Sequence, residues 1–432
     1  MVLDLRSADH FKLHDMPTLH QLFATVCVLI LFVGCQPNAE RSTSEPATVG
    51  VEQVDVPVGE ESGQPQLHTD GSNLWLSWVE PAGEDEHRLR YASFDGNAWS
   101  EARTVASGQE WFVNWADVPS VRTLPDGRKA AHFLVSNGPN IFAYDVRIAQ
   151  TDPSGEWQEA ITPHDDGTQT EHGFVSMLPW QDDLMAVWLD GREMVLDPDD
   201  EHDHGTGAMT LRAGLLDSEG DVLESFLLDD HVCECCPTAG VETGGGLLFA
   251  YRDRTEDNIR NISLVRFDEE GWTEPYTLHD DGWHLDGCPV NGPALAANGD
   301  RVVASWFTAA HGEPRVYAAF SEDAGRTFGD PIIIDEHQPN GQVGTAFLED
   351  GSAVISWHGR HEDEDALLVK RLVDSEATSD PVVVHAPMPA VRTGIPRIAR
   401  LGDHLYAAWV ERGDEDNRPI VRMARVPGQA LE

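Results

Sequence analysis

Six side chains able to bind a soft metal or to form disulfides lie in two short segments in the middle of the chain: His231, Cys233, Cys235, Cys236, His284 and Cys288. Thiolate and imidazole groups together form a ligand set that suits Cu(I) or Zn(II), although the CxCC spacing is not a standard zinc motif. Cysteines of exported chains are also commonly joined in disulfides, and four cysteines allow three pairings. The simplest pairing joins Cys288 to the CxCC segment. The sequence leaves structural disulfides, a metal site and redox activity as alternatives.

Three arginines offer a different chemistry, the binding of an anion. Arg252, Arg360 and Arg397 stand in or beside short apolar segments that alternate like strands. A guanidinium group pairs with a carboxylate through two parallel hydrogen bonds, so three converging arginines would hold an anionic ligand. The alternative is that each arginine pairs with one of the many carboxylates near it.

Two further groups of residues could take part in ligand binding. Trp111, Trp115 and Trp283 could stack on sugar rings, or they could anchor loops by burying their own rings. The acidic, histidine-containing tract at residues 197–204 could hold a divalent cation, or it could be a solvated loop. The sequence does not select between the two interpretations of either group.

An internal repeat must position these residues. An aromatic residue occupies the same place in seven strand-like segments, spaced 51 to 63 residues apart: Trp78, Phe133, Trp188, Tyr251, Trp306, Trp357 and Trp409. Most of these segments follow a turn such as Asp-Gly or Gly-Asp and precede a second alternating run, which is typical of β-hairpins. Seven such units of four short strands predict an all-β, seven-bladed β-propeller. The segment 51–56 stands alone before the first unit, and we expect it to supply the outer strand of the last blade.

Blade topology assigns the loops of such a propeller to two faces. The connections between blades share one face with the loops between the second and third strands of each blade. Both cysteine segments are connections of this kind, and they serve adjacent blades. We therefore expect the four cysteines to converge near the mouth of the central channel.

One segment resembles a motif of a known family. Ser321, Asp323, Gly325, Thr327 and Phe328 form the pattern S-x-D-x-G-x-T-F. This pattern resembles the Asp-box of the sialidase-like (BNR-repeat) β-propellers, and weaker copies stand in three other units. In that family the box is a structural turn between the third and fourth strands, on the face opposite the active site. The CxCC and GCPVNGP segments together resemble an uncharacterised branch of the same proteins.

The resemblance also implies an enzymatic alternative. Sialidases bind the carboxylate of their sugar with three arginines, and they use a tyrosine nucleophile, an assisting glutamate and an aspartate acid. An exo-alpha-sialidase-like glycoside hydrolase would here use Arg252, Arg360 and Arg397 as the clamp. The chain departs from the family in three respects. The Arg-Ile-Pro motif before the first blade is absent, Tyr251 and Tyr406 lie inside predicted strands, and seven blades are expected instead of six.

The first fifty residues indicate export. Leu22 to Val33 is an unbroken run, apolar except for Thr25, that is too short to span a bilayer and has the length of a signal-peptide core. The Gly-Cys pair that follows resembles the lipidation site of bacterial lipoproteins. We expect residues 1–34 to be a signal peptide, 35–50 to hold a lipidated Cys35 and a flexible linker, and 51–432 to form the propeller. The lipid would anchor the protein to a bacterial membrane, at the periplasmic face or the outer membrane.

The charge of the chain argues against one class of partner. The sequence has 29 Lys and Arg against 75 Asp and Glu, a net charge of −46. Such an excess of negative charge repels nucleic acid, whose binding needs a basic surface. We expect an exported, membrane-anchored propeller that binds a glycan, a protein ligand or a soft metal at its cysteine-bearing channel mouth. A glycosidase is the alternative.

Overall fold

The computed structural model describes residues 50–196, 205–373, 376–377, 380–389, 393–413 and 417–431. The predicted signal peptide, Cys35, the linker up to residue 49 and the tract at residues 197–204 lie outside these ranges. Residues 48–432 form one compact unit, to which all the strands described below belong. Within the described part of the chain, no helix combines the length and the apolar character needed to cross a membrane.

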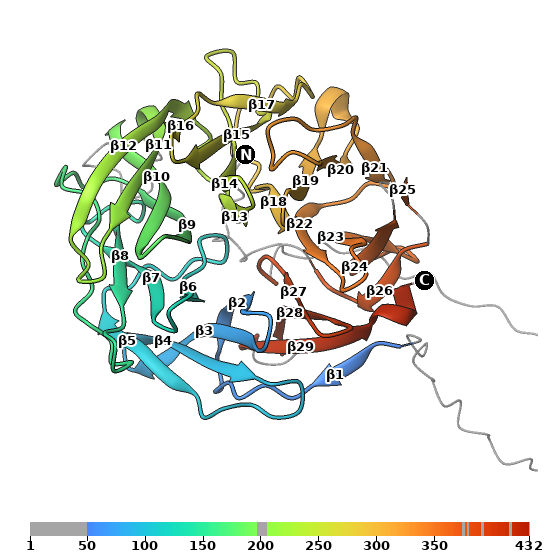
Figure 1. The fold of residues 1–432 in the computed structure, drawn as a ribbon, viewed down its shortest axis with the longest axis horizontal. Helices are drawn as coiled ribbons and strands as arrows, with labels where there is room; N and C mark the ends of the chain where they lie inside the picture. The colour runs from blue at the N-terminus through green and yellow to red at the C-terminus, as the bar shows by residue number, and fades with distance from the viewer. Residues whose placement is uncertain are drawn as a thin grey trace, which may run out of the picture. The chain divides into compact units, whose positions relative to one another are not determined.

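Seven antiparallel sheets form a ring, so the prediction of an all-β, seven-bladed propeller is confirmed (Figure 1). The first blade consists of β2 (Gly63–Thr69), β3 (Leu74–Gly83), β4 (Glu86–Phe94) and β5 (Arg103–Gln109). The second consists of β6 (Ser120–Thr123), β7 (Lys129–Ser136) and β8 (Tyr144–Gln150). The third consists of β9 (His172–Trp180), β10 (Asp183–Val195), β11 (Thr206–Leu216) and β12 (Val222–Val232). The second blade has three strands, and a single bridge between Ile148 and Ile161 stands where its fourth strand would pair.

The other four blades repeat the same order from the channel outward. The fourth blade consists of β13 (Ala239–Thr243), β14 (Gly246–Arg252), β15 (Ile262–Asp268), β16 (Gly271–Trp272) and β17 (Tyr276–His279), and the fifth of β18 (Ala294–Asn298), β19 (Arg301–Thr308), β20 (Arg315–Ser321) and β21 (Ile332–Asp335). The sixth blade consists of β22 (Gly341–Phe347), β23 (Ala353–His361), β24 (Glu364–Val373), β25 (Glu376–Ala377) and β26 (Val382–His385). The seventh consists of β27 (Arg397–Leu401), β28 (His404–Arg412) and β29 (Pro419–Pro427). Two short 3-10 turns, η1 (Ala310–Gly312) and η2 (Gly428–Leu431), complete the described elements.

The repeated aromatic residues form the core of the ring. Each lies on the second strand of its blade, and all seven are buried: Trp78, Phe133, Trp188, Tyr251, Trp306, Trp357 and Trp409. Four of the tryptophans also donate their indole N–H to a carboxylate, at 2.6 to 2.9 Å: Trp78 to Glu80, Trp188 to Asp190, Trp306 to Asp281 and Trp357 to Asp335. A buried N–H without a partner would be costly, so these acids satisfy the polar atom that each ring brings into the core.

The N-terminal segment closes the ring as predicted. β1 (Glu52–Val54) pairs antiparallel with β29 and becomes the outer strand of the seventh blade (Figure 1). An ion pair between Glu52 and Arg425, at 2.6 Å, fixes this register. The first and last parts of the propeller are therefore held together by one sheet, which leaves β29 no free edge in the described structure.

The Asp-box forms the turn that its sequence predicts. The Asp323 carboxylate accepts hydrogen bonds from the Thr327 backbone N–H at 2.8 Å and from the hydroxyls of Ser321 and Thr327. Gly325 has a φ of +78°, and a Cβ at this position would collide with Leu248 of the neighbouring blade. Phe328 packs against the cluster of apolar side chains between blades four and five. The box thus lies after β20, on the face away from the cysteine segments.

Candidate functional site

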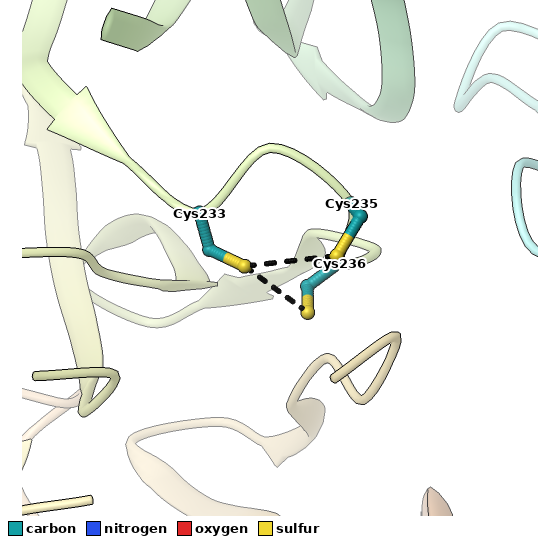
Figure 2. Close-up of side chains that lie close together, drawn as sticks. All are labelled: Cys233, Cys235 and Cys236. Carbon is teal, nitrogen blue, oxygen red and sulfur yellow. Dashed lines mark hydrogen bonds between the residues drawn. The ribbon is translucent and has the colours of Figure 1, made fainter. Parts of the chain in front are cut away.

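The loop between β12 and β13 brings three thiols together at the mouth of the channel. Figure 2 shows the side chains of Cys233, Cys235 and Cys236 turned toward one another. The Sγ atom of Cys233 lies 3.5 Å from that of Cys236 and 3.9 Å from that of Cys235. Cys233 and Cys236 are buried, and all three sulfur atoms lie within 4.8 Å of one another. The loop therefore presents a preformed cluster of soft ligand atoms.

The thiols of this cluster differ in their tendency to ionise. Burial opposes ionisation of Cys233, but its hydrogen-bond contacts with Cys235 and Cys236 and the charge of Arg260 outweigh burial and hold the pKa of Cys233 well below its ordinary value. Burial, followed by the hydrogen bond with Cys233, raises the pKa of both Cys235 and Cys236. The pKa of Cys233 is thus shifted in the opposite direction to the pKa values of Cys235 and Cys236.

The fourth cysteine reaches the cluster from the next blade. Cys288 lies in the loop between β17 and β18 and hydrogen-bonds to Cys235, an interaction that contributes to the raised pKa of Cys235. All four thiols are free, so the predicted disulfides are not formed in this structure. The two histidines do not join the thiols. His284 is exposed and lies 3.8 Å from Asp286, while the nearest charged neighbours of His231 include Asp253.

A second cluster, which sequence analysis did not identify, stands beside the thiols. Asp117 precedes β6, Tyr144 begins β8 and Glu171 precedes β9, and a bridge between Tyr144 and Glu171 holds their backbones side by side. The Tyr144 hydroxyl donates to Glu171 Oε1 at 2.6 Å and lies 3.5 Å from Asp117 Oδ2. Asp117 Oδ2 also accepts the N–H of Phe174 at 2.9 Å, while Asp117 Oδ1 is buried without a hydrogen-bond partner.

Both carboxyl groups of this cluster have pKa values raised toward neutral pH. Burial raises the pKa of Asp117 to about 7, against the opposing hydrogen bonds from Phe174 and Tyr144. Burial also raises the pKa of Glu171 to about 8, and the negative charges of Asp117, Glu234 and Cys233 act in the same direction. The pKa of Glu171 therefore depends on the charge of the thiol cluster.

The three predicted clamp arginines have separate surroundings. Arg252 is buried, and its guanidinium group donates to three backbone carbonyls, those of Asn291, Arg260 and Phe307. The Arg360 side chain is 42% exposed and pairs with Asp365 at 3.3 Å. Among the three, only Arg397 lines the cavity of about 190 Å³ in the central channel. Burial lowers the pKa of Arg397 to about 10, and the nearby Asp117 opposes that shift.

The three predicted stacking tryptophans also differ from one another. Trp111 stacks on Phe133 at a ring distance of 4.6 Å, and Trp283 is buried beneath the Arg252 guanidinium, 4.9 Å from its ring centre. Both rings thus anchor loops. Trp115 is 42% exposed and lines a separate cavity of about 290 Å³ between blades one and seven. Trp115 is thus the member of the group whose ring is accessible from a cavity.

Comparisons with known proteins agree with this architecture. No protein-family model matches the chain, and no curated protein matches it. The solved structure of the polysaccharide lyase Uly1 has a TM-score of 0.51 and 10% identity, over 85% of this chain and 90% of that one. The NanB sialidase of Streptococcus pneumoniae (K499G mutant) has a TM-score of 0.47 and 12% identity, over 88% of this chain and 71% of that one. The GH93 alpha-L-arabinofuranosidase of Fusarium graminearum has a TM-score of 0.46 and 11% identity, over 88% of this chain and 97% of that one.

At these identities the comparisons concern the fold. The chain forms a seven-bladed β-propeller, and it shares its fold with the polysaccharide lyase Uly1. A shared propeller does not define an activity, because unrelated activities occur on the same fold. The function has to be argued from the two clusters at the channel mouth.

Proposed function

We propose that the protein binds one soft metal ion, Cu(I) or Zn(II), through Cys233, Cys235, Cys236 and Cys288 at the mouth of the propeller. The observation that carries this proposal is the spacing of the sulfur atoms. Two thiolates bound to one ion at about 2.3 Å lie about 3.8 Å apart in a tetrahedral site and about 4.0 Å apart in a trigonal site. The Sγ separations of 3.5 and 3.9 Å are close to these values, whereas a disulfide requires about 2.05 Å.

The charges around the cluster support the same assignment. A metal bound by several thiolates carries a net negative charge, which needs cationic neighbours in a buried site. Arg260 lies beside Cys233, and Arg252 acts on Cys236. The backbone N–H of Asn291 donates to Cys236 Sγ at 3.3 Å, a contact that orients a ligand sulfur. The predicted signal peptide and lipid anchor would place this site outside the cytoplasm, facing extracytoplasmic metal.

Replacement of the cysteines tests the proposal. Protein purified without reductant is expected to carry about one equivalent of copper or zinc, measured by elemental analysis and native mass spectrometry. Cys233→Ser and Cys235→Ser are each expected to reduce the bound metal to near zero, because each removes a thiolate from a small ligand set. Growth with added copper or added zinc distinguishes the two ions.

The matched control is Ser218→Ala, on the opposite face of the third blade, which should retain the wild-type metal content. Protein that contains two disulfides and no metal, with no thiols to titrate after unfolding, would contradict the proposal. Cobalt(II) substitution gives an independent reading, because thiolate ligands produce charge-transfer absorption that an oxygen-ligated ion lacks.

The second cluster favours a second candidate function, hydrolysis of an anionic glycan. We propose that Tyr144, Glu171 and Asp117 would be the reacting groups. These are the residue types that sialidases use as nucleophile, assisting base and acid, and here the Tyr144 hydroxyl contacts both carboxyl groups. Arg397 lines the same cavity as Asp117 and supplies one cation for the sugar carboxylate. The sequence-based clamp of three arginines is reduced in this proposal to Arg397.

Release of 4-methylumbelliferone from a sialoside tests this candidate. The wild-type protein should release the fluorophore, and Tyr144→Phe should lower kcat by about 100-fold or more, because it removes only the reacting hydroxyl. Arg397→Ala should mainly raise KM, because it removes a contact to the bound carboxylate. Wild-type protein that releases no fluorophore above the buffer rate would exclude the sialidase activity and leave the metal proposal unaffected.

A further inference from the structure

A third group of ligand-type side chains lies on the same face, at the junction of blades two and three. The connection from β8 to β9 carries His164 and Asp166, and it ends at His172, the first residue of β9. The rings of His164 and His172 stack at 3.9 Å with an interplanar angle of 3°. Their side chains are 3% and 0% exposed, and Asp145, at the second position of β8, faces both rings.

The side of the stack that faces β10 is balanced in charge. His172 Nδ1 lies 3.1 Å from the Thr170 carbonyl, and His172 Nε2 lies 3.3 Å from Asp166 and 3.6 Å from Asp190. His172 Nε2 has no hydrogen-bond partner, but the neighbours of both ring nitrogens are acceptors, which favours a proton on each. Arg192 adds a second cation, with hydrogen bonds to Asp190. Two carboxylates are therefore matched by two cations on this side.

The other side of the stack is not balanced in the same way. Asp166 Oδ2 is an acceptor 3.0 Å from His164 Nδ1, so in the neutral ring Nδ1 carries the proton and Nε2 the lone pair. This Nε2 atom is buried, has no hydrogen-bond partner and lies 3.7 Å from Asp145 Oδ1. Asn137 likewise has one side-chain atom that is paired and one that is not. Its Nδ2 donates to Asp145 and to the Thr168 carbonyl, and its Oδ1 is buried without a partner. Two lone-pair atoms thus stand unpaired beside one carboxylate.

These unpaired atoms belong to residues that line one cavity. A surface cavity of about 300 Å³ is lined by His164, Asn137 and Asp145, and also by Asp165. Two ligand atoms that bind the same ion at about 2.1 Å lie between about 3.0 and 4.2 Å apart. The 3.7 Å separation of His164 Nε2 and Asp145 Oδ1 falls within this range. His164 is thus both buried at its Nε2 atom and part of the wall of this cavity.

We infer that this cavity binds a divalent transition-metal cation of the Mn²⁺ or Zn²⁺ type. His164 Nε2 and the Asp145 carboxylate are its protein ligands, and Asn137 Oδ1, Asp165 and water supply further oxygen atoms. A mixed set of one imidazole and several oxygens suits these ions better than it suits Cu(I). The site is distinct from the thiol cluster in position and in ligand chemistry, and it does not depend on the function proposed for the cysteines.

Asp166 has a positioning role in this site. A carboxylate that accepts the Nδ1–H of a ligand histidine fixes the tautomer and the orientation of the ring. Asp166 is itself held by the hydroxyl and the backbone N–H of Thr168. Removal of such a partner typically weakens metal binding by about 10- to 100-fold. Asp166→Asn should therefore weaken binding without removing a ligand.

Mn²⁺ binding to the full chain tests the inference, because thiolates bind this ion poorly. The EPR signal of free Mn²⁺, recorded in excess Mg²⁺ to occupy the acidic surface, should report one site. His164→Gln and Asp145→Asn should each weaken binding by at least about 10-fold, and Asp166→Asn by about 10- to 100-fold. The exposed His337 provides the matched control, since its side chain is 89% exposed and remote from the cavity, so His337→Gln should bind as the wild type does.

Two results would overturn the inference. One is a wild-type protein that takes up no Mn²⁺ in excess Mg²⁺, and the other is unchanged binding by His164→Gln. Thermal unfolding in the absence of metal checks that each variant is folded. If His164→Gln fails to fold, Asp165→Asn replaces it, because Asp165 is exposed and its substitution removes only a cavity carboxylate. Unchanged binding by Asp165→Asn and Asp145→Asn together would then reject the site.

Discussion

Arg252→Met is expected to lower the free energy of unfolding by about 3 to 5 kcal/mol. The Arg252 guanidinium links blade four to blade five by donating to the carbonyls of Asn291, Arg260 and Phe307, at 2.6 to 2.8 Å. Methionine keeps most of the side-chain volume over Trp283 but leaves three carbonyl oxygens without their donor. Urea unfolding followed by tryptophan fluorescence measures the effect.

Arg360→Met is the matched comparison, because Arg360 was predicted for the same clamp but is partly exposed and paired only at the surface. Its expected effect is within about 0.5 kcal/mol. If wild type and Arg252→Met unfold at the same urea concentration, the three carbonyls must have found other donors. That result would reopen a ligand-binding role for Arg252.

The stability of the protein is expected to fall as the pH rises from about 5 to 8. Asp117 and Glu171 have pKa values raised by burial to about 7 and about 8, so the folded protein retains protons that the unfolded chain releases. The stabilisation is complete below the ordinary carboxyl pKa and is lost as the pH passes the raised values. For Asp117 alone, the loss between pH 5 and 7 is about 2.5 kcal/mol.

Asp117→Asn and Glu171→Gln identify the source of this pH dependence. Each amide keeps the shape of the neutral carboxyl group and does not titrate. The difference between wild type and variant, measured by urea unfolding at each pH, cancels contributions from the many other acids. A wild-type curve and an Asp117→Asn curve that stay parallel from pH 5 to 8 would mean that Asp117 is ionised in the folded protein.

The fold was predictable from the sequence because every copy of the repeat carries a large aromatic side chain at the same position. The aromatic position recurs with the length of a blade, and burial of each ring requires the same sheet around it. The closing strand was predictable because 51–56 had no partner in its own unit. The carboxylates that receive the tryptophan N–H groups were not predicted. Glu80 and Asp190 stand two residues after their rings, but Asp281 and Asp335 come from elsewhere in the chain.

The candidate sites were predictable only where residue types were rare. Four cysteines in two loop segments are enough to indicate a disulfide or metal site, and the structure places their thiols in contact. The cluster of Asp117, Tyr144 and Glu171 has no motif, since each residue comes from a different segment of an acid-rich chain. The signal that could have found it is position, because Asp117 and Glu171 each lie within three residues before an innermost strand. The burial of Arg252 could not be read from sequence, since its partners are backbone carbonyls.

The pairing of β1 with β29 also determines the order in which the chain can mature. Glu52 and Arg425 are separated by 373 positions, so these two strands cannot meet until β29 has been synthesised. Until then the growing chain carries a seventh blade that lacks its outer strand, with exposed edges that can pair with other chains. Joining such distant segments costs loop-closure entropy and is slow compared with hairpin formation inside a blade. Completion of the ring is therefore a late step of biogenesis, and products that terminate before β29 lack the strand to which the N-terminal segment pairs.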